Sequence, residues 1–121
     1  MMKVMIIGGG GREHALAHAI SVSALLTELL ATPGNPGIAE LARCLDCPDE
    51  SAIFSAIKNE GVDLVVIGPE APLVDGMADR LNTAGVAVFG PSQQAAMLEG
   101  SKAFARAFCD RHHIPQPGWR Q

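Results

Sequence analysis

The chain has 121 residues, a length that suits one domain, and 48% of them are hydrophobic, which is enough for a packed core. Aromatic residues make up only 4%, so the core must be mainly aliphatic, as in a parallel α/β sheet. The formal net charge of −4 argues against a nucleic-acid-binding surface, which needs a basic face.

Short β-branched runs predict strands, and longer Ala-rich segments with a 3.6-residue spacing predict helices. In the first half of the chain they predict a strand, a helix, a strand, a helical turn and a short strand, at residues 3–7, 12–21, 28–31, 38–42 and 43–45. In the second half they predict a helix, a strand, a helix, a strand and two more helices, at residues 48–60, 62–67, 73–84, 86–89, 92–98 and 101–112. Asp75 falls in the first turn of the helix at 73–84, where we expect a structural role.

Strands that alternate with helices over short connections indicate βαβ units, and therefore a Rossmann-like, doubly wound parallel sheet of about five strands. Ligands bind such sheets beyond the carboxyl ends of the strands. Loops rich in glycine and proline follow three of the predicted strands, at residues 8–11, 33–37 and 68–72. We therefore expect these three loops to converge on one crevice.

The first of these loops, from Gly8 to Gly11, leads from a strand into a helix, which is typical of an anion site at a helix N-terminus. The dinucleotide fingerprint G-x-G-x-x-G is not met, because its third glycine position holds Glu13 or His14, depending on the starting glycine. The second strand also ends without the acidic residue that binds an adenosine ribose. Both observations disfavour a dinucleotide.

Arg12 points instead to a terminal phosphate, because a guanidinium adds a two-pronged, charge-assisted contact to the helix end. The alternative is that Arg12 and Glu13 form a solvated first turn. Glu13 is a further candidate for ligand binding, with capping of the helix or orientation of Arg12 as its alternatives. We expect His14 to be packed or hydrogen-bonded in that helix rather than catalytic.

Polar residues in the other two loops are also candidate ligand contacts. Glu70 directly follows the fourth predicted strand, where a carboxylate can accept two hydrogen bonds from a sugar diol; an exposed turn residue is the alternative. Asn35 lies between Gly34 and Pro36 and can donate to a ligand, although asparagine is also common in such turns.

Cys44 and Cys47 form a C-x-x-C motif, but no second ligand pair follows at zinc spacing, so we expect ordinary thiols rather than a zinc or redox site. No apolar stretch approaches the ~20 residues of a membrane span, and the apolar N-terminal segment is too short for a signal peptide. We therefore expect a cytoplasmic protein whose partners include neither a membrane nor a nucleic acid.

Four motifs together resemble the N-terminal part of the glycinamide ribonucleotide synthetases, also called phosphoribosylamine–glycine ligases. They are GGREHA, PGNPG, GPEAPL and LEGSKAF, at residues 10–15, 33–37, 68–73 and 98–104. They occur in the family's order and spacing and cover almost the whole chain, which makes the resemblance specific. One departure is Gly9, where the family more often has a polar residue such as Asn.

The resemblance implies a carbon–nitrogen ligase of the ATP-grasp superfamily, which joins glycine to 5-phosphoribosylamine in purine biosynthesis. ATP becomes ADP and phosphate, with an acyl phosphate of glycine as the intermediate and Mg²⁺ or Mn²⁺ bridging the phosphate oxygens. Gly10, Gly11 and Arg12 would then face the 5-phosphate, and Glu70 would face the ribose hydroxyls.

The resemblance also implies that Asn35 and Pro69 shape this pocket. Lys102 resembles the ATP-grasp lysine near the nucleotide phosphates, and a surface lysine in the first turn of a helix is its alternative. The family continues well beyond residue 121, into the lobes that hold most of the ATP and the metal. We therefore divide the chain into a phosphoribosylamine-binding domain at residues 1–98 and a linker with the first helix of a truncated ATP-grasp domain at 99–121.

From this division we expect a catalytically inactive fragment of a protein that is monomeric at full length. Phe104 and Phe108 in the last predicted helix would expose apolar surface, through which the fragment could associate. Two alternatives remain open. One is a free-standing Rossmann-like module that binds NAD(P) or a regulatory nucleotide, and the other is a purely structural fragment.

Overall fold

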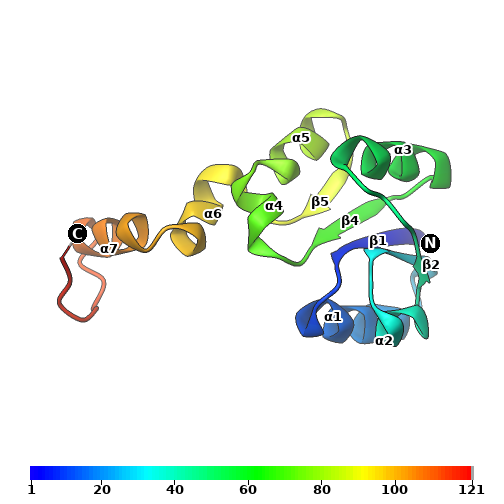
Figure 1. Cartoon of the computed structure of the whole chain (residues 1–121), viewed down its shortest axis with the longest axis horizontal. Helices are drawn as coiled ribbons and strands as arrows, with labels where there is room; N and C mark the ends of the chain where they lie inside the picture. The colour runs from blue at the N-terminus through cyan, green and yellow to red at the C-terminus, as the bar shows by residue number, and fades with distance from the viewer. Residues whose placement is uncertain (121) are drawn as a thin grey trace.

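Five parallel strands form one sheet with helices on both of its faces, in a computed structural model that describes residues 1–120 (Figure 1). The strands are β1 Met2–Gly8, β2 Leu26–Pro33, β3 Arg43–Cys44, β4 Leu64–Ile67 and β5 Ala87–Phe89. Their order across the sheet is β3-β2-β1-β4-β5, and every neighbouring pair is parallel. The predicted doubly wound parallel sheet is confirmed.

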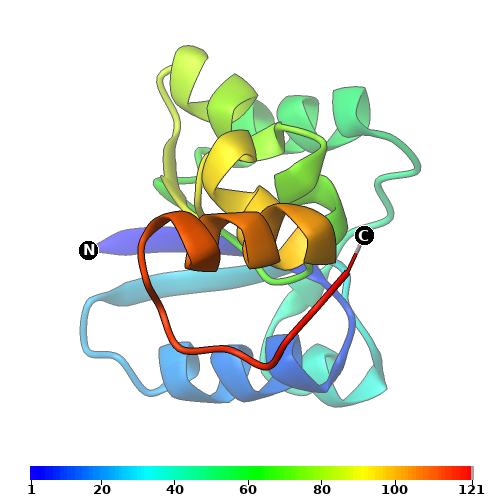
Figure 2. The same ribbon diagram turned by 90° about the vertical axis from the view of Figure 1, so that its left-hand side faces the viewer.

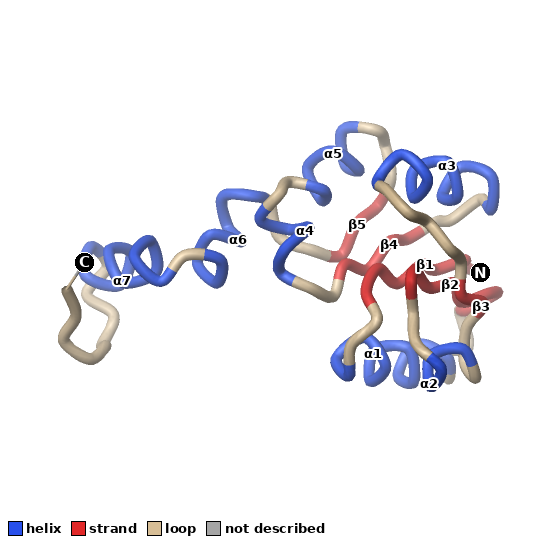
Figure 3. Tube along the Cα trace, in the orientation of Figure 1, coloured by secondary structure: helices blue, strands red, loops and turns tan. Residues whose placement is uncertain are grey.

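The helices cover the two faces of the sheet separately (Figure 3). On one face lie α1 and α2, and on the other lie α3, α4 and α5 (Figure 1). Their bounds are α1 Gly11–Ser21, α2 Pro36–Ala39, α3 Glu50–Glu60, α4 Glu70–Val74 and α5 Met77–Thr83. This arrangement follows from the βαβ connections, because each crossover returns the chain to the sheet on a fixed side.

Each face of the sheet has its own aliphatic core. Val4 and Ile6 of β1 pack on the side of α1 with Ala17, whereas Met5 and Ile7 pack on the side of α3 and α5. This alternation is the two-residue period of a strand, and both faces are apolar because both are covered by helices. The low aromatic content of the chain is consistent with these cores of Ile, Leu, Val, Ala and Met.

The direction of strand succession reverses between β1 and β4, which are neighbours in the sheet although the chain visits β2 and β3 between them. In the parallel register, Ile7 of β1 is level with both Thr32 of β2 and Ile67 of β4. The loops that follow these three strands therefore leave the sheet at one edge. A doubly wound sheet has its ligand crevice at such a reversal point.

The predicted helix at 73–84 is wrong, because two helices occupy this region. α4 begins directly after Pro69 and ends at Val74, and Gly76 then adopts a left-handed conformation with φ of +92° before α5 begins. A left-handed residue interrupts the helical hydrogen-bond ladder, and glycine adopts it without steric cost. Asp75 consequently ends α4 and is not in the first turn of a helix.

Several element boundaries also differ from the predicted ones. β2 is longer than predicted at both ends, whereas β3, β4 and β5 are shorter, and α2 begins at Pro36. Asp49 and Ser92 are the N-cap residues of α3 and of α6 Gln93–Gly100, each through a side-chain oxygen that accepts a backbone N–H.

The last two helices, α6 Gln93–Gly100 and α7 Lys102–Arg111, form an arm that extends away from the sheet (Figure 1). Figure 2, viewed from the end of the arm, shows α7 and the chain after it in front of the sheet. That following chain is tied to α7 by Asp110, which accepts hydrogen bonds from Gln116 and Trp119. Within residues 1–120, no helix combines the length and the apolar character needed to cross a membrane.

Candidate functional site

The three glycine- and proline-rich loops are tied to one another by hydrogen bonds. The backbone N–H of Gly34 donates to the carbonyl oxygen of Gly8 at 3.1 Å, and that of Gly68 donates to Ile7 at 3.0 Å. The Asn35 side-chain amide donates to the carbonyl of Gly9 at 2.9 Å. The three loops therefore meet at one edge of the sheet, as predicted, whereas the crevice that was expected between them stays a prediction.

The N-terminus of α1 opens into this edge. The first intrahelical hydrogen bond runs from the His14 N–H to the Gly10 carbonyl, at 3.0 Å. The N–H groups of Gly11, Arg12 and Glu13 precede this bond, so they have no acceptor within the helix. A methyl group on Gly11 would meet no other atom within 4 Å, so open space lies beside the helix end. Directed N–H groups, the helix dipole and open space together suit an anion.

Arg12 reaches from α1 across to the loop after β4. Its Nη1 donates to the Gly68 carbonyl at 3.2 Å, and its Nη2 lies 3.9 Å from Oε2 of Glu70. The side chains of Arg12 and Glu70 are 61% and 52% exposed, so this ion pair contributes little to stability. The ion pair instead places the two side chains, because it keeps a cation and a carboxylate with spare hydrogen-bonding capacity side by side at the helix end.

Glu13 lies under the loop, with only 5% of its surface exposed. Its Oε2 accepts a hydrogen bond from the Gly10 N–H at 2.7 Å. Gly10 is the N-cap residue of α1 and Glu13 is the third residue of the helix, so this bond is the carboxylate half of a capping box. The capping role, one of the alternatives for Glu13, is present in the structure.

Asn35 uses both ends of its side-chain amide within the protein. Its Oδ1 accepts from the Ile38 N–H at 2.8 Å, which caps α2, and its Nδ2 holds the Gly9 carbonyl. Pro69 is the N-cap residue of α4, so its neighbour Glu70 begins that helix. Asn35 and Pro69 thus shape the loops that carry the exposed groups.

The His14 imidazole lies against Gly37 of α2, where a methyl group would come within 2.9 Å of Nδ1. This contact joins α1 to α2, but His14 is otherwise exposed, so the expectation of a packed or hydrogen-bonded residue is met only by the contact with Gly37. The contact also accounts for the glycine at position 37, since a side chain there would displace the ring.

Lys102 lies apart from the three loops, in the first turn of α7 on the arm. It lines a hollow of about 240 Å³ with Ala103, Arg106, Trp119 and Arg120. Arg106 and Arg120 were not predicted as site residues from the sequence. Arg106 could have been found from its spacing, because residues four apart on one helix, such as Lys102 and Arg106, lie on the same face. Arg120 reaches the hollow only because the chain after α7 folds back towards the helix.

Another hollow has no charged group in its lining. This hollow, of about 300 Å³, lies between the end of α1 and the amino ends of the central strands, and its lining is aliphatic except for Ser23. The three-loop edge is not an enclosed cavity, but it brings together Gly10, Gly11, Arg12 and Glu70.

Similarity to known proteins agrees with this geometry. The family described as "Phosphoribosylglycinamide synthetase, N domain" matches residues 2–99. A phosphoribosylamine–glycine ligase of Agrobacterium fabrum is 56% identical over 116 residues, which cover 94% of this chain and 27% of that protein. The enzyme of the same name from Rhizobium meliloti is 50% identical over 122 residues, which cover 99% of this chain and 29% of the relative.

Solved structures with the same fold include the crystal structure of phosphoribosylamine–glycine ligase from Thermotoga maritima. It is 29% identical, with a TM-score of 0.69, and the match covers 92% of this chain and 25% of that one. A biotin carboxylase domain of a bacterial carboxylase has a TM-score of 0.71 at 21% identity, which shows a shared fold alone. This chain thus spans about a quarter of the length of its curated relatives, and it belongs to the phosphoribosylglycinamide synthetase N-domain family.

Proposed function

We propose that the three-loop edge binds the phosphate and ribose of 5-phosphoribosylamine. The observation that carries this proposal is the position of Arg12, which lies in the first turn of α1 and brings its guanidinium to the Gly68 carbonyl and next to Glu70. A phosphomonoester carries close to two negative charges, which a helix end and a guanidinium neutralise together. Glu70 offers the acceptor oxygens that a sugar diol needs.

In this arrangement each residue has a distinct role. Gly10 and Gly11 face the 5-phosphate across the open helix end, and Arg12 binds its oxygens. Glu70 accepts hydrogen bonds from the ribose hydroxyls. Because Arg12 and Glu70 are neighbours, one sugar phosphate can place its phosphate on Arg12 and its hydroxyls on Glu70 at the same time.

We further propose that the chain is the N-terminal part of a cytoplasmic ligase. The full-length enzyme would join glycine to 5-phosphoribosylamine in purine biosynthesis, with ATP becoming ADP and phosphate. The names of the relatives support this proposal. Residues 1–98 would form the substrate domain, and residues 99–121 would form a linker and the first helix of the ATP-grasp part.

The residues on the arm fit one end of ATP. Lys102, Arg106 and Arg120 place three cations around one hollow, which suits a polyphosphate. Within residues 1–120, no group of three or more His, Cys, Asp or Glu side chains is placed to hold a metal ion. We therefore expect the ligands of Mg²⁺ or Mn²⁺ to lie in other parts of a full-length protein, and this chain alone to be inactive.

Titration of the ¹⁵N-labelled chain with ribose 5-phosphate tests the substrate site. We expect saturable shifts of the amides of residues 8–13, and smaller shifts with ribose or inorganic phosphate at the same concentration. Amides in this loop that stay unmoved at about 10 mM ligand, well above the millimolar range of weak binding, would contradict the proposal. Saturable binding of NADH at the same amides would favour the free-standing nucleotide module instead.

A further inference from the structure

Three glycines from two different loops surround the buried carboxylate of Glu13. A methyl group added to Gly8 would lie 2.8 Å from Cδ of Glu13, and one added to Gly10 would lie 2.8 Å from Oε2. A methyl group on Gly68 would lie 2.6 Å from Cδ and would overlap Oε1. All three distances are shorter than van der Waals contact, so the Glu13 side chain fills the space that these glycines leave.

Backbone conformation explains only one of these glycines. Gly8 has a φ of +129°, which side-chain-bearing residues rarely adopt. Gly10 has an ordinary extended conformation, with φ −93° and ψ −175°, and Gly68 is not among the residues with positive φ. The atoms nearest to a methyl group on Gly10 or Gly68 belong to Glu13. Room for Glu13, rather than backbone freedom, is therefore what requires glycine at positions 10 and 68.

Arg12 and Glu13 hold Gly68 from two sides. Arg12 donates to its carbonyl oxygen, and the next residue, Glu13, occupies the place where a side chain of Gly68 would stand. The second oxygen of the Glu13 carboxylate, Oε2, accepts a hydrogen bond from the Gly10 N–H. A single side chain therefore spans the loop after β1 and the loop after β4.

We infer that Glu13 is a positioning residue, which sets the separation of these two loops and so places Arg12 for a phosphate. This inference rests on the proposed sugar-phosphate site. It differs from the prediction that Glu13 binds the substrate, because the carboxylate faces the protein and is almost fully buried. It also means that the Gly10 N–H is already used, which leaves the N–H groups of Gly11, Arg12 and Glu13 for the anion.

A double-mutant cycle measured by thermal unfolding tests the steric part of the inference. Gly68→Ala alone should lower Tm by about 5 °C or more, because the methyl group collides with Glu13. In a Glu13→Ala background, Gly68→Ala should lower Tm by less than half as much. Gly10→Ala should behave in the same way.

Two control variants make this cycle specific. Gly8→Ala should regain only part of its loss in Tm with Glu13→Ala, because a φ of +129° strains a side chain even where the clash with Glu13 is gone. Gly11→Ala should change Tm little in either background, because a methyl group there would meet no other atom within 4 Å. Equal losses from Gly68→Ala in both backgrounds would overturn the inference. If Glu13→Ala does not fold, Glu13→Ser in its place gives the same comparison.

Ribose 5-phosphate binding tests the functional part. Glu13→Gln keeps the volume and an acceptor for the Gly10 N–H, so the dissociation constant should stay within about twofold of the wild-type value. Glu13→Ala removes the spacer and should weaken binding about fivefold or more. A tenfold loss in Glu13→Gln, about 1.4 kcal/mol, would instead show direct contact with the ligand and would overturn the positioning role.

The two proposals fail in different ways. If the wild-type chain does not bind ribose 5-phosphate, the proposed function fails, while the cycle between Glu13 and Gly68 still decides whether Glu13 spaces the loops. If the wild-type chain binds and Arg12→Ala does not, but Glu13→Ala binds as well as the wild type, the sugar-phosphate site stands and the positioning role is wrong.

Discussion

From the sequence alone, Arg12 can be interpreted either as a solvated residue or as a ligand-binding one, because its neighbours in space are not known. The sequence placed it at a helix end and left both interpretations open. The fold adds the Gly68 carbonyl and Glu70 as neighbours. No local pattern predicts these contacts, because they depend on β4 lying beside β1 in the sheet.

Arg12→Ala should weaken ribose 5-phosphate binding by about 1.5–3 kcal/mol, or roughly 10- to 150-fold, which is typical of a charge-assisted hydrogen bond. Arg12→Lys should recover part of this loss, since it keeps the charge but not the planar fork. Isothermal titration calorimetry measures both. Arg111→Ala, on the arm, is a matched control that should leave the affinity unchanged, and an unchanged affinity in Arg12→Ala would contradict the assignment.

Glu70→Gln separates the sugar from the phosphate. The variant loses part of its capacity to accept hydrogen bonds from a diol, so the affinity for ribose 5-phosphate should fall about 5- to 10-fold. Inorganic phosphate should bind as well as before or better, because a carboxylate beside Arg12 has been neutralised. Parallel titrations with the two ligands measure this difference, and an equal loss for both would show that Glu70 only orients Arg12.

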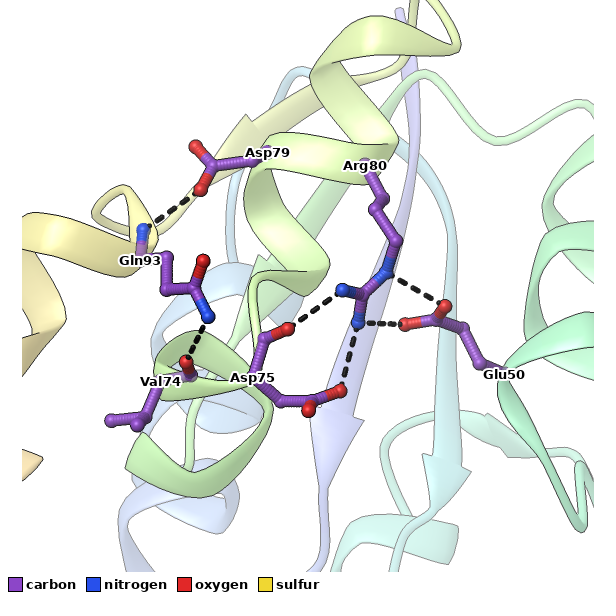
Figure 4. Close-up of polar contacts among 6 residues, drawn as sticks. All are labelled: Glu50, Val74, Asp75, Asp79, Arg80 and Gln93. Carbon is purple, nitrogen blue, oxygen red and sulfur yellow. Dashed lines mark hydrogen bonds and ion pairs between the residues drawn. The ribbon is translucent and has the colours of Figure 1, made fainter.

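Among the elements, α4 and α5 are held in place by Arg80 (Figure 4). Its guanidinium binds both carboxylate oxygens of Glu50, at 2.7 and 2.8 Å, and also the Asp75 carbonyl and carboxylate. The hydrogen bond to Glu50 is the main reason that the pKa of Arg80 is raised. One side chain of α5 therefore joins the start of α3 to the end of α4.

Arg80→Ala should lower Tm, because it removes these contacts from three elements at once, and Arg80→Lys should recover little of the loss because lysine lacks the two-pronged geometry. Raising the salt concentration should narrow the difference from the wild type, since the groups are exposed and screened. Differential scanning calorimetry at low and high salt measures both effects. A Tm for Arg80→Ala equal to that of the wild type would show that the cluster does not support the fold.

A second exposed cluster, on the β2–β3 side of the sheet, gives a pH prediction. Hydrogen bonds from Arg43 hold the pKa values of Glu28 and Glu60 below the usual 4.5. A lowered pKa in the folded state adds stability that is complete above pH 4.5 and is lost as the pH falls through the lowered values. The difference in unfolding free energy between the wild type and Arg43→Gln should therefore be constant above about pH 4.5 and shrink as the pH falls below it.

Urea unfolding at a series of pH values measures this change. Lys58→Gln, in the last turn of α3, is the control and should differ from the wild type by the same amount at each pH. A difference for Arg43→Gln that stays constant across the range would mean that these carboxylates titrate alike in the folded and unfolded chains.

The elements predicted well were those with strong local signals. Acidic residues at the start of α3 and the mostly apolar run at 62–67, which contains β4, are signals that do not depend on the rest of the chain. The break between α4 and α5 was missed because Gly76 is locally compatible with a helix. The position of Arg80, which binds the carbonyl of Asp75, favours the broken form only once the chain is folded.

For the whole molecule, alternation of strands and helices predicted the parallel sheet, and the order of strands located the crevice. The helices α6 and α7 were predicted, but their direction away from the sheet was not, because no pattern in their sequence specifies it. Within residues 102–111 no side chain is buried, and Phe104 is 39% exposed. An exposed aromatic on a projecting helix suits contact with another surface.

If the arm lets the chain associate, as the sequence analysis expects, Phe104→Ser should shift the chain towards monomer at a given concentration. Sedimentation velocity over about a hundredfold range of concentration measures this shift, which follows mass action. Phe89→Ser, on the exposed edge strand β5, is the control because this phenylalanine is more exposed than Phe104 but lies on the sheet. An equal shift in both variants would place the contact outside the arm.

The hydrogen bond between the Trp119 indole and Asp110 has a practical consequence. Trp119 is the only tryptophan of the chain, and the sequence contains no tyrosine. Intrinsic emission excited at the indole band therefore reports on the tip of the arm alone, whereas far-ultraviolet circular dichroism is dominated by the helices around the sheet. Comparing the two signals during denaturation separates detachment of the arm's last segment from loss of the sheet, and coincident curves would identify the arm as part of one cooperative unit.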